Sequence, residues 1–377
     1  MSPVNLIREP IEEKIEQLLS QMTLEEKIGQ TNQINAFGEP EKELVRKGLV
    51  GSIINATSAF TGMGSSPSAS AEICNAIQHI AVTESRLHIP ILFGRDVIHG
   101  YRTVFPIPLG QAASWNPELV EIAAAVAASE ASADGIKWTF APMVDIARDP
   151  RWGRVAEGYG EDPCLASSMS AAAVRGFQDP DVSAAHKIVA CVKHFVGEGG
   201  AEGGRDYESA EISMRTLRDI YLPPFRAAVN AGVGTLMAAF HDLNGIPLSA
   251  HRQLLTEVLR LEWGFKGFVV SDWASIEELV NHGVARDRAE ASALALFAGV
   301  DMDMVSGSYL ENLGSLLEQG RLTPETLDEA VRRILRIKFL AGLFDRPYTD
   351  PAAQPAPYSR QKTAAPPACW LNNRSFC

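Results

Sequence analysis

Short apolar, β-branched runs alternate with long alanine- and leucine-rich stretches along most of this 377-residue chain. Apolar runs bounded by polar or turn residues predict buried strands, and the stretches between them favour helices. The expected strands are 50–55, 89–96, 138–145, 188–195, 235–240, 268–273 and 300–304, and the expected helices include 118–134, 209–231 and 286–298. Such alternation predicts a parallel sheet, which closes into a TIM-like (β/α)8 barrel when about eight units are present. One strand fewer than eight is recognisable, so an open doubly wound sheet is the alternative.

Polar side chains stand at or just beyond the ends of these apolar runs. The residues concerned are Asp96, Asp145, Lys193, His194, His241, Asp242, Asp272 and Asp301. A barrel gathers the carboxyl ends of its strands at one face, where active sites lie, whereas an open sheet spreads them along an edge. Strands also end in polar residues for ordinary reasons of solvation, so this position alone assigns no role.

The run 268–273 ends on a carboxylate beside a tryptophan. Asp272 stands where a barrel would place a catalytic group, and Trp273 offers an aromatic wall of the kind that packs against a sugar ring. The alternative is that Asp272 caps a helix that begins near Ser275, because aspartate is also a favourable N-terminal residue.

Lys193 and His194 end a strand and precede a loop with five glycines. Both side chains can donate hydrogen bonds to ligand hydroxyls, and glycine lets a backbone approach a ligand closely. Adjacent strand residues point to opposite faces, so one of the pair is structural unless the strand has already ended. The glycine spacing fits neither the dinucleotide nor the P-loop pattern, so nucleotide binding is not expected.

Two further polar segments contain candidate ligand-binding residues. Arg154 ends the dense polar loop 147–154, where its guanidinium can fork onto vicinal hydroxyls or a carboxylate. For Arg148 and Arg151 in the same loop, surface ion pairs are the preferred interpretation. Asp96 ends an apolar run, and its carboxylate can accept hydrogen bonds from two sugar hydroxyls at once.

The charge balance and the cysteines limit which partners and cofactors are expected. A net charge of −12 and a pI near 5.2 argue against nucleic acid or an anionic membrane as the partner. Five scattered cysteines without a Cys-x-x-Cys pair predict reduced thiols, and no metal-ligand spacing appears. We therefore expect neither a metal nor another cofactor.

The first 30 residues predict two amphipathic helices with a capping box from Thr23 to Glu26 between them. The chain starts without a basic segment or an apolar core of signal-peptide type, which predicts a cytoplasmic location. No window reaches the length of a transmembrane helix.

The sequence resembles glycoside hydrolase family 3, and within it the bacterial β-glucosidase branch. The matching stretches, in the family's order, are 96–110, 141–154, the loop after Lys193 and His194, 244–247 and 263–273. The resemblance implies a single barrel domain over 31–348, with 1–30 as a helical segment packed on it. It also implies retaining hydrolysis of terminal non-reducing β-D-glucosyl residues from small β-glucosides or cello-oligosaccharides.

By this resemblance, Asp272 is the nucleophile that forms a covalent glycosyl-enzyme. The residues implied to hold the glucosyl unit are Asp96, Arg154, Lys193, His194, Tyr207, Met237 and Trp273. Retention also needs a second carboxyl group as acid/base, about 5 Å from the nucleophile.

The end of the chain departs from the family's pattern. In the β-glucosidases the acid/base lies on a second, α/β sandwich domain, but residues 349–377 are rich in proline and alanine and predict a disordered or aberrant tail. We therefore expect impaired catalysis, and self-association through an exposed apolar surface that normally meets the second domain. The alternatives are a non-catalytic sugar-binding barrel or an inactive truncated fragment.

Single-domain β-N-acetylglucosaminidases of the family use a histidine from the loop after Lys-His as acid/base. This chain has no histidine in that loop. Glu198 and Glu202 are the two acidic residues there, and they are the weak candidates for proton donor. A metal-dependent barrel hydrolase is a further alternative, and it would need clustered His and Asp ligands.

Overall fold

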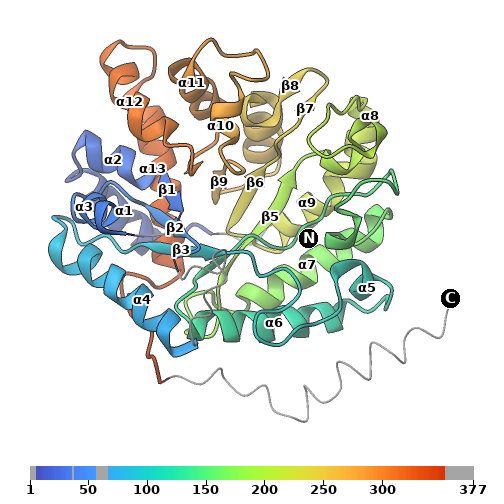
Figure 1. The fold of residues 1–377 in the computed structure, drawn as a ribbon, viewed down its shortest axis with the longest axis horizontal. Coiled ribbons are helices and arrows are strands. Elements are labelled where there is room, and N and C mark those ends of the chain that lie inside the picture. The colour runs from blue at the N-terminus through green and yellow to red at the C-terminus, as the bar shows by residue number, and fades with distance from the viewer. Residues whose placement is uncertain (1–5, 36–37, 57–66, 353–377) are drawn as a thin grey trace.

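The computed structural model describes residues 6–35, 38–56 and 67–352. Its main sheet has eight strands in the order β10-β1-β2-β3-β4-β5-β6-β9, every neighbouring pair parallel, with helices outside it (Figure 1). Hydrogen bonds from Asp301 N to Val269 O (2.8 Å) and from Ser271 N to Met302 O (2.9 Å) join the two ends of this order. The predicted (β/α)8 barrel is confirmed, and the open sheet is excluded.

The elements have these bounds. The strands are β1 Asn32–Asn35, β2 Ser52–Ile54, β3 Leu92–Arg95, β4 Trp138–Thr139, β5 Val189–Phe195, β6 Thr235–Ala238, β9 Phe268–Val270 and β10 Asp303–Met304, and β7 Asp242–Leu243 with β8 Ile246–Pro247 forms a hairpin. The α-helices are α1 Glu9–Leu19, α2 Leu24–Gln30, α3 Glu39–Arg46, α4 Pro67–His79, α5 Pro108–Ala112, α6 Pro117–Ala133, α7 Pro163–Gln178, α8 Met214–Thr216, α9 Leu222–Asn230, α10 Ser275–Glu278, α11 Arg288–Ala298, α12 Ser308–Glu318 and α13 Pro324–Leu340. Shorter 3-10 or π-helical segments are η2 Ile80–Glu84, η3 Val155–Glu157, η4 Glu198–Gly200, η5 Glu202–Gly204, η6 Leu217–Tyr221, η7 Leu248–Ala250 and η8 Gln253–Glu262.

The strand that the sequence did not predict is β1. Its residues, Asn-Gln-Ile-Asn, are mostly polar and so give no apolar run. The strand is nevertheless buried at its start, where Gln33 Nε2 donates to Ser52 Oγ at 2.9 Å inside the barrel. The strand can therefore be buried without being apolar, because buried polar side chains are tolerated when they are hydrogen-bonded.

Several predicted elements are shorter than expected. The strand expected over 138–145 pairs regularly only as β4, and the helix expected over 209–231 begins at Met214, where the Ser213 hydroxyl caps it by accepting from Thr216 N. The β7–β8 hairpin was missed, although its Asn244-Gly245 turn is a strong hairpin signal.

The barrel interior is packed with large side chains rather than open. Trp138 contacts Phe140 and Phe268, with ring centroids 4.6 and 5.1 Å apart. The Trp138 indole N–H donates to Thr235 Oγ1 at 2.8 Å, so its polar atom is satisfied. This aromatic layer belongs to a core cluster that also includes Met237.

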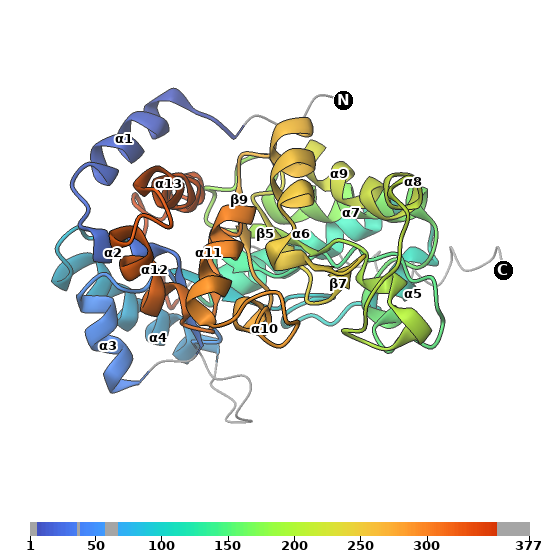
Figure 2. The ribbon, with the colours of Figure 1, turned by 90° about the horizontal axis from the view of Figure 1, so that it is seen from above.

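The N-terminal helices lie against the C-terminal helix of the barrel (Figure 2). Arg336 of α13 donates two hydrogen bonds to Glu12 of α1, at 2.6 and 2.7 Å. The predicted capping box of Thr23 and Glu26 is present at the start of α2. Residues 1–5 and most of the predicted tail, 353–377, lie outside the described residues. No helix in the described ranges is long and apolar enough to cross a membrane.

Candidate active site

A cavity of about 410 Å³ opens at the carboxyl ends of the barrel strands. The residues that line it are Ile54, Asn55, Asp96, Phe140, Arg154, Lys193, His194, Tyr207, Met237, Phe240, Asp272, Trp273 and Met304. The structure thus brings together the nucleophile candidate and every residue predicted to hold the sugar. Glu198 and Glu202 do not line the cavity.

Lys193 and His194 both line the cavity, although they are neighbours at the end of β5. The register of β5 against β6 shifts between Val192 and Phe195, so the strict alternation of side chains ends there. The Lys193–His194 peptide bond is cis. Both side chains line the same cavity.

Lys193 forms an ion pair with Asp96, with Nζ 2.7 Å from Oδ1. Burial by itself would lower the pKa of Lys193, but the attraction and hydrogen bond of the Asp96 carboxylate outweigh it and raise that pKa above its ordinary value. Lys193 is therefore a charged donor that Asp96 holds in place.

His194 is oriented by Asp145. Asp145 Oδ2 accepts from both the backbone N–H and Nδ1 of His194, each at 2.9 Å. Burial lowers the pKa of His194 well below its ordinary value, so the imidazole is neutral. With the proton on Nδ1, the Nε2 lone pair is turned toward Asp272 Oδ2, 3.6 Å away, and can accept a hydroxyl proton.

Asp272 lies just beyond the end of β9. Its Oδ1 accepts from Trp273 N at 2.7 Å, while Oδ2 is buried and has no hydrogen-bond partner among the described residues. Burial raises the pKa of Asp272, and the nearby His194 and Lys193 oppose that rise. The alternative that its side chain caps a helix is wrong, because the N-cap of α10 is Ala274.

Arg154 is held by two glutamates. Its Nε and Nη2 donate to the two carboxylate oxygens of Glu157 at 2.9 and 3.1 Å, and its Nη1 donates to Glu198 Oε1 at 3.1 Å. Glu198 is fully buried, whereas Glu202 is exposed. Arg151 pairs with Asp149 at the surface, which agrees with the expected surface ion pair.

Two aromatic side chains form the rim. Trp273 is 41% exposed and Tyr207 is 54% exposed, so each presents an accessible ring at the mouth of the cavity. Tyr207 packs edge-on against Phe240 at a centroid distance of 4.8 Å. Exposed aromatic rings beside polar groups suit the alternating apolar and hydroxyl surfaces of a sugar.

One group of buried residues has the composition of a metal site. His194, Glu198 and Asp272 present ligand atoms that all lie within 4.8 Å of one another. The two carboxylates, however, approach opposite ring nitrogens, Glu198 Oε2 at 3.4 Å from Nδ1 and Asp272 Oδ2 at 3.6 Å from Nε2. His194 Nδ1 and Glu198 Oε1 already have partners within the chain, Asp145 Oδ2 at 2.9 Å and Arg154 Nη1 at 3.1 Å, so we interpret this group as part of the hydrogen-bonded wall of the cavity.

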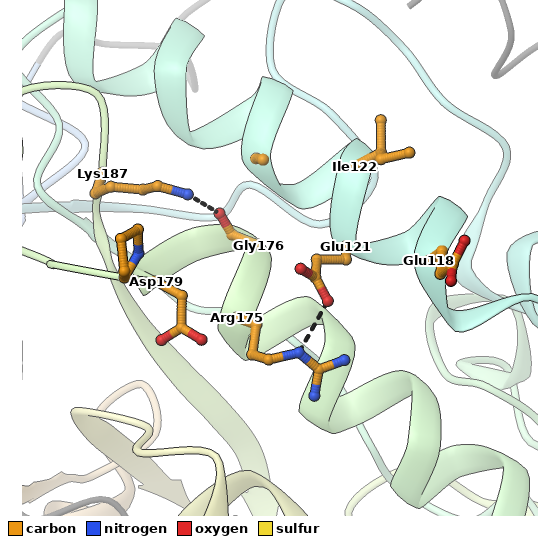
Figure 3. Close-up of a pocket in the computed structure, with 9 residues that line it drawn as sticks. Glu118, Glu121, Ile122, Arg175, Gly176, Asp179 and Lys187 are labelled. Carbon is orange, nitrogen blue, oxygen red and sulfur yellow. Dashed lines mark hydrogen bonds and ion pairs between the residues drawn. The ribbon is translucent and has the colours of Figure 1, made fainter. Parts of the chain in front are cut away.

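A second pocket lies on the outer wall, between α6 and α7 (Figure 3). Its main charges are already satisfied within the chain: Arg175 Nε donates to Glu121 Oε2 at 2.8 Å, and Lys187 Nζ donates to Gly176 O at 2.9 Å. None of the predicted site residues lies there, so the strand-end cavity is the candidate site.

Sequence reasoning missed the roles of several residues around this cavity. Asp145 was recognised as a strand-end residue, but its contact with His194 was not predicted. Asn55, Phe240 and Met304 line the cavity at strand ends, and that position is the signal that would have found them. Glu157 does not lie at a strand end, so its position in the sequence does not indicate a role. Its contact with Arg154 forms only in the folded loop.

The fold and this cavity define the structural class of the protein, which is a (β/α)8 barrel with a carboxylate-containing pocket at its strand ends. The profile described as "Glycosyl hydrolase family 3 N terminal domain" matches residues 23–337. The chain belongs to glycosyl hydrolase family 3, and the match covers that family's N-terminal domain.

Known relatives agree with this assignment. The chain is 42% identical over 336 residues to "Periplasmic beta-glucosidase" of Salmonella typhimurium, covering 88% of this chain and 42% of that protein. It is 37% identical over 368 residues to "Lysosomal beta glucosidase" of Dictyostelium discoideum, covering 90% of this chain and 45% of that one. A beta-glucosidase from Listeria innocua in complex with glucose superposes with a TM-score of 0.85 at 39% identity, covering 95% of this chain and 51% of that chain. The chain thus spans about half the length of these relatives.

Proposed function

We propose that this chain is the nucleophile-bearing barrel of a retaining β-glucosidase that acts on terminal β-D-glucosyl residues of small β-glucosides or cello-oligosaccharides. The observation that carries the proposal is the free Oδ2 of Asp272, placed among Lys193, His194 and Arg154 in a sugar-sized cavity. Similarity to proteins named beta-glucosidase, one of them in complex with glucose, supports the substrate class. The cytoplasmic location stays a prediction, and one relative is named periplasmic.

In this proposal, Asp272 Oδ2 attacks the anomeric carbon while the bond to the leaving oxygen breaks, which gives a glycosyl ester. Water then attacks the same carbon and releases Asp272. Lys193, Asp96, His194 and Arg154 hold the sugar hydroxyls. Attack requires the ionised carboxylate, so activity falls as the pH falls through the raised pKa of Asp272.

The proton donor is the unassigned part of this mechanism. Among the described residues that line the cavity, the carboxyl groups belong to Asp96 and Asp272, and Asp96 is paired with Lys193. Glu198 lies behind the cavity wall and Glu202 is exposed. We therefore propose that cleavage by this chain depends strongly on the leaving group, because no carboxyl group among the described lining residues is assigned as proton donor, and such a donor contributes roughly 10²–10⁴ in rate for poor leaving groups.

The domain assignment is part of the same proposal: a barrel over 31–348, with 1–30 packed on it. We also propose self-association through exposed apolar side chains, of which Val104, Ile107 and Trp115 form one group. The net charge supports the absence of nucleic acid and membrane partners.

The proposed function is tested by intact-mass spectrometry after incubation with a 2-deoxy-2-fluoro glucoside that has a good leaving group. One added fluoroglucosyl mass is expected on the wild-type chain, none on Asp272→Ala, and one on the surface control Asp149→Ala. Folded wild-type protein that gains no adduct would contradict the proposed nucleophile. Glucose binding without an adduct would instead indicate a non-catalytic sugar-binding barrel.

A further inference from the structure

Glu198 is a fully buried glutamate that the proposed mechanism does not use. It lies in the short helical turn η4, directly after the strand that contributes Lys193 and His194. Its Oε1 accepts from Arg154 Nη1 at 3.1 Å, and its Oε2 lies 3.4 Å from His194 Nδ1 without a hydrogen-bond partner among the described residues. Glu198 therefore contacts two residues of the cavity wall from behind, His194 of strand β5 and Arg154 of the loop that follows β4.

The charges around Glu198 favour its neutral form. Asp145, Asp206 and Asp272 face it as carboxyl groups, and Arg154 is the cation in direct contact. The surrounding groups that complete the cluster are Lys193, His194, Glu157 and His241. If Asp145, Glu198 and Asp272 were all ionised, three buried carboxylates would face one buried cation, Lys193, and the partly buried Arg154. Burial, and then repulsion by Asp145, raise the pKa of Glu198 well above its ordinary value.

Glu198 is not placed to protonate the leaving group directly, because its carboxyl group does not line the cavity. Its Oε2 lies 3.4 Å from Nδ1 of the His194 ring. On the Nδ1 side of that ring, Asp145 Oδ1 also lacks a partner among the described residues. If Glu198 is protonated, the Nδ1 side of the His194 ring contains one buried negative charge, that of Asp145, and not two. The hydrogen bond from Arg154 to Glu198 Oε1 does not require Glu198 to be ionised.

We propose that Glu198 is a positioning residue that works as a neutral carboxylic acid, fixing the Arg154 guanidinium and the His194 imidazole relative to each other. The inference rests on the proposed function, since Arg154 and His194 are the residues proposed to hold the sugar. It changes the interpretation of Glu198 from candidate proton donor to support for the sugar site.

The test compares Glu198→Gln with Glu198→Ala, using Glu202→Gln in the neighbouring turn as the matched control. Glutamine keeps the shape and the acceptor oxygen and cannot ionise. We expect Glu198→Gln to label with the fluoroglucoside within about threefold of wild type, and Glu198→Ala to label roughly 10–100-fold more slowly, as for a lost hydrogen bond to a charged group. Thermal melting of each variant checks that the fold is intact.

A pH profile separates positioning by a neutral acid from simple packing. As the pH rises through the raised pKa of Glu198, the wild-type labelling rate should fall, because the ionised side chain adds charge beside Asp145. Glu198→Gln should lack this alkaline decline, and Glu202→Gln should keep it. Equal labelling rates for Glu198→Ala and wild type would overturn the proposal, as would a Glu198→Gln variant that is as slow as Glu198→Ala.

The proposed function and the role of Glu198 fail in different ways. If wild-type protein gains no adduct but binds glucose, the dissociation constant of glucose replaces the labelling rate, with the same order expected among the variants. Wild-type protein that neither labels nor binds glucose would refute both proposals. Wild-type protein that labels while the Glu198 variants match it would refute only the role of Glu198.

Discussion

At the scale of single residues, the polar side chains of the cavity are held in place by other side chains. Lys193 is held by Asp96, His194 by Asp145, and Arg154 by Glu157 and Glu198. Lys193 and Arg154 are thus held as donors, and His194 as an acceptor through Nε2, each fixed by a carboxylate partner. This arrangement lowers the ordering cost of binding, because the side chains do not need to be immobilised again.

The pair of Asp96 and Lys193 gives a direct test of this arrangement. Asp96→Asn removes a charged acceptor and leaves the buried Lys193 ammonium without its ion-pair partner. Glucose affinity should fall by roughly 10–100-fold, the range for hydrogen bonds to charged groups. Isothermal titration calorimetry measures this, with Asp149→Asn as a surface control. Unchanged affinity in Asp96→Asn would exclude Asp96 from the sugar site.

His241 makes acid stability a second test. The side chain is fully buried, neither ring nitrogen has a hydrogen-bond partner among the described residues, and burial lowers its pKa from 6.5 to about 4. Because the unfolded chain binds this proton more tightly, the contribution of His241 to stability is present above pH 6.5 and is lost as the pH falls toward 4.

Replacing His241 by asparagine should therefore flatten the acid side of the stability curve. Between pH 4 and pH 6.5, the slope of the free energy of unfolding against pH should be smaller in the variant than in the wild type, by up to about 1.4 kcal/mol per pH unit. Urea unfolding at several pH values measures the slope, and His88→Asn, at an exposed position, is the control. An unchanged slope in His241→Asn would show that His241 does not titrate in this way.

At the scale of elements, the closure of the barrel depends on buried charge. Arg260 of η8 pairs with Asp301 just before β10 and donates to the carbonyls of Gly267 and Gly299. Asp301 Oδ2 also accepts from Val269 N of β9 at 2.7 Å, and Arg333 of α13 donates to its other oxygen. One carboxylate thus joins the last two strands of the barrel and two helical segments.

Asp301→Asn should weaken this closure. The substitution leaves the Arg260 guanidinium buried without its counter-charge, which costs about 3–5 kcal/mol in the free energy of unfolding. Glu262→Gln, which removes the exposed pair with Arg218, should cost less than about 1 kcal/mol. Urea unfolding of both variants measures the difference, and equal small losses would mean that the buried pair does not hold the barrel closed.

At the scale of the whole molecule, one feature suggests contact with another surface. The segment from β3 to α6 exposes Val104, Ile107, Leu109 and Trp115, with Val104 75% and Trp115 71% exposed. Large exposed apolar side chains that are close in the chain are an association risk, whereas isolated ones are ordinary.

We expect the average mass of the chain to rise with concentration in sedimentation velocity experiments. A variant with Val104→Lys and Trp115→Lys should remain at the mass of one chain over the same range, because two charges then oppose burial of this surface. Lysine at Leu261, an exposed apolar position of η8, is the control. Equal association of the wild type and both variants would place the contact elsewhere.

The sequence by itself predicted the strand–helix alternation of a barrel and several residues of its cavity. Strand–helix alternation is a local pattern, and the end of each apolar run marks where a side chain enters the active face, so Asp96, Lys193, His194 and Asp272 could be predicted. The polar strand β1 was not predicted, because it has no apolar run; a hydrogen bond from Gln33 to Ser52 stabilises it instead.

Only the tertiary structure decided what stands behind the cavity wall. Glu198 and Glu202 are four residues apart and look alike in the sequence, yet one is fully buried against Arg154 and His194 and the other is exposed. The bonds of Asp145 to His194 and of Glu157 to Arg154 likewise join different loops or depend on a folded turn. Burial and neighbouring charge, which set the protonation of these groups, exist only when distant segments meet in space.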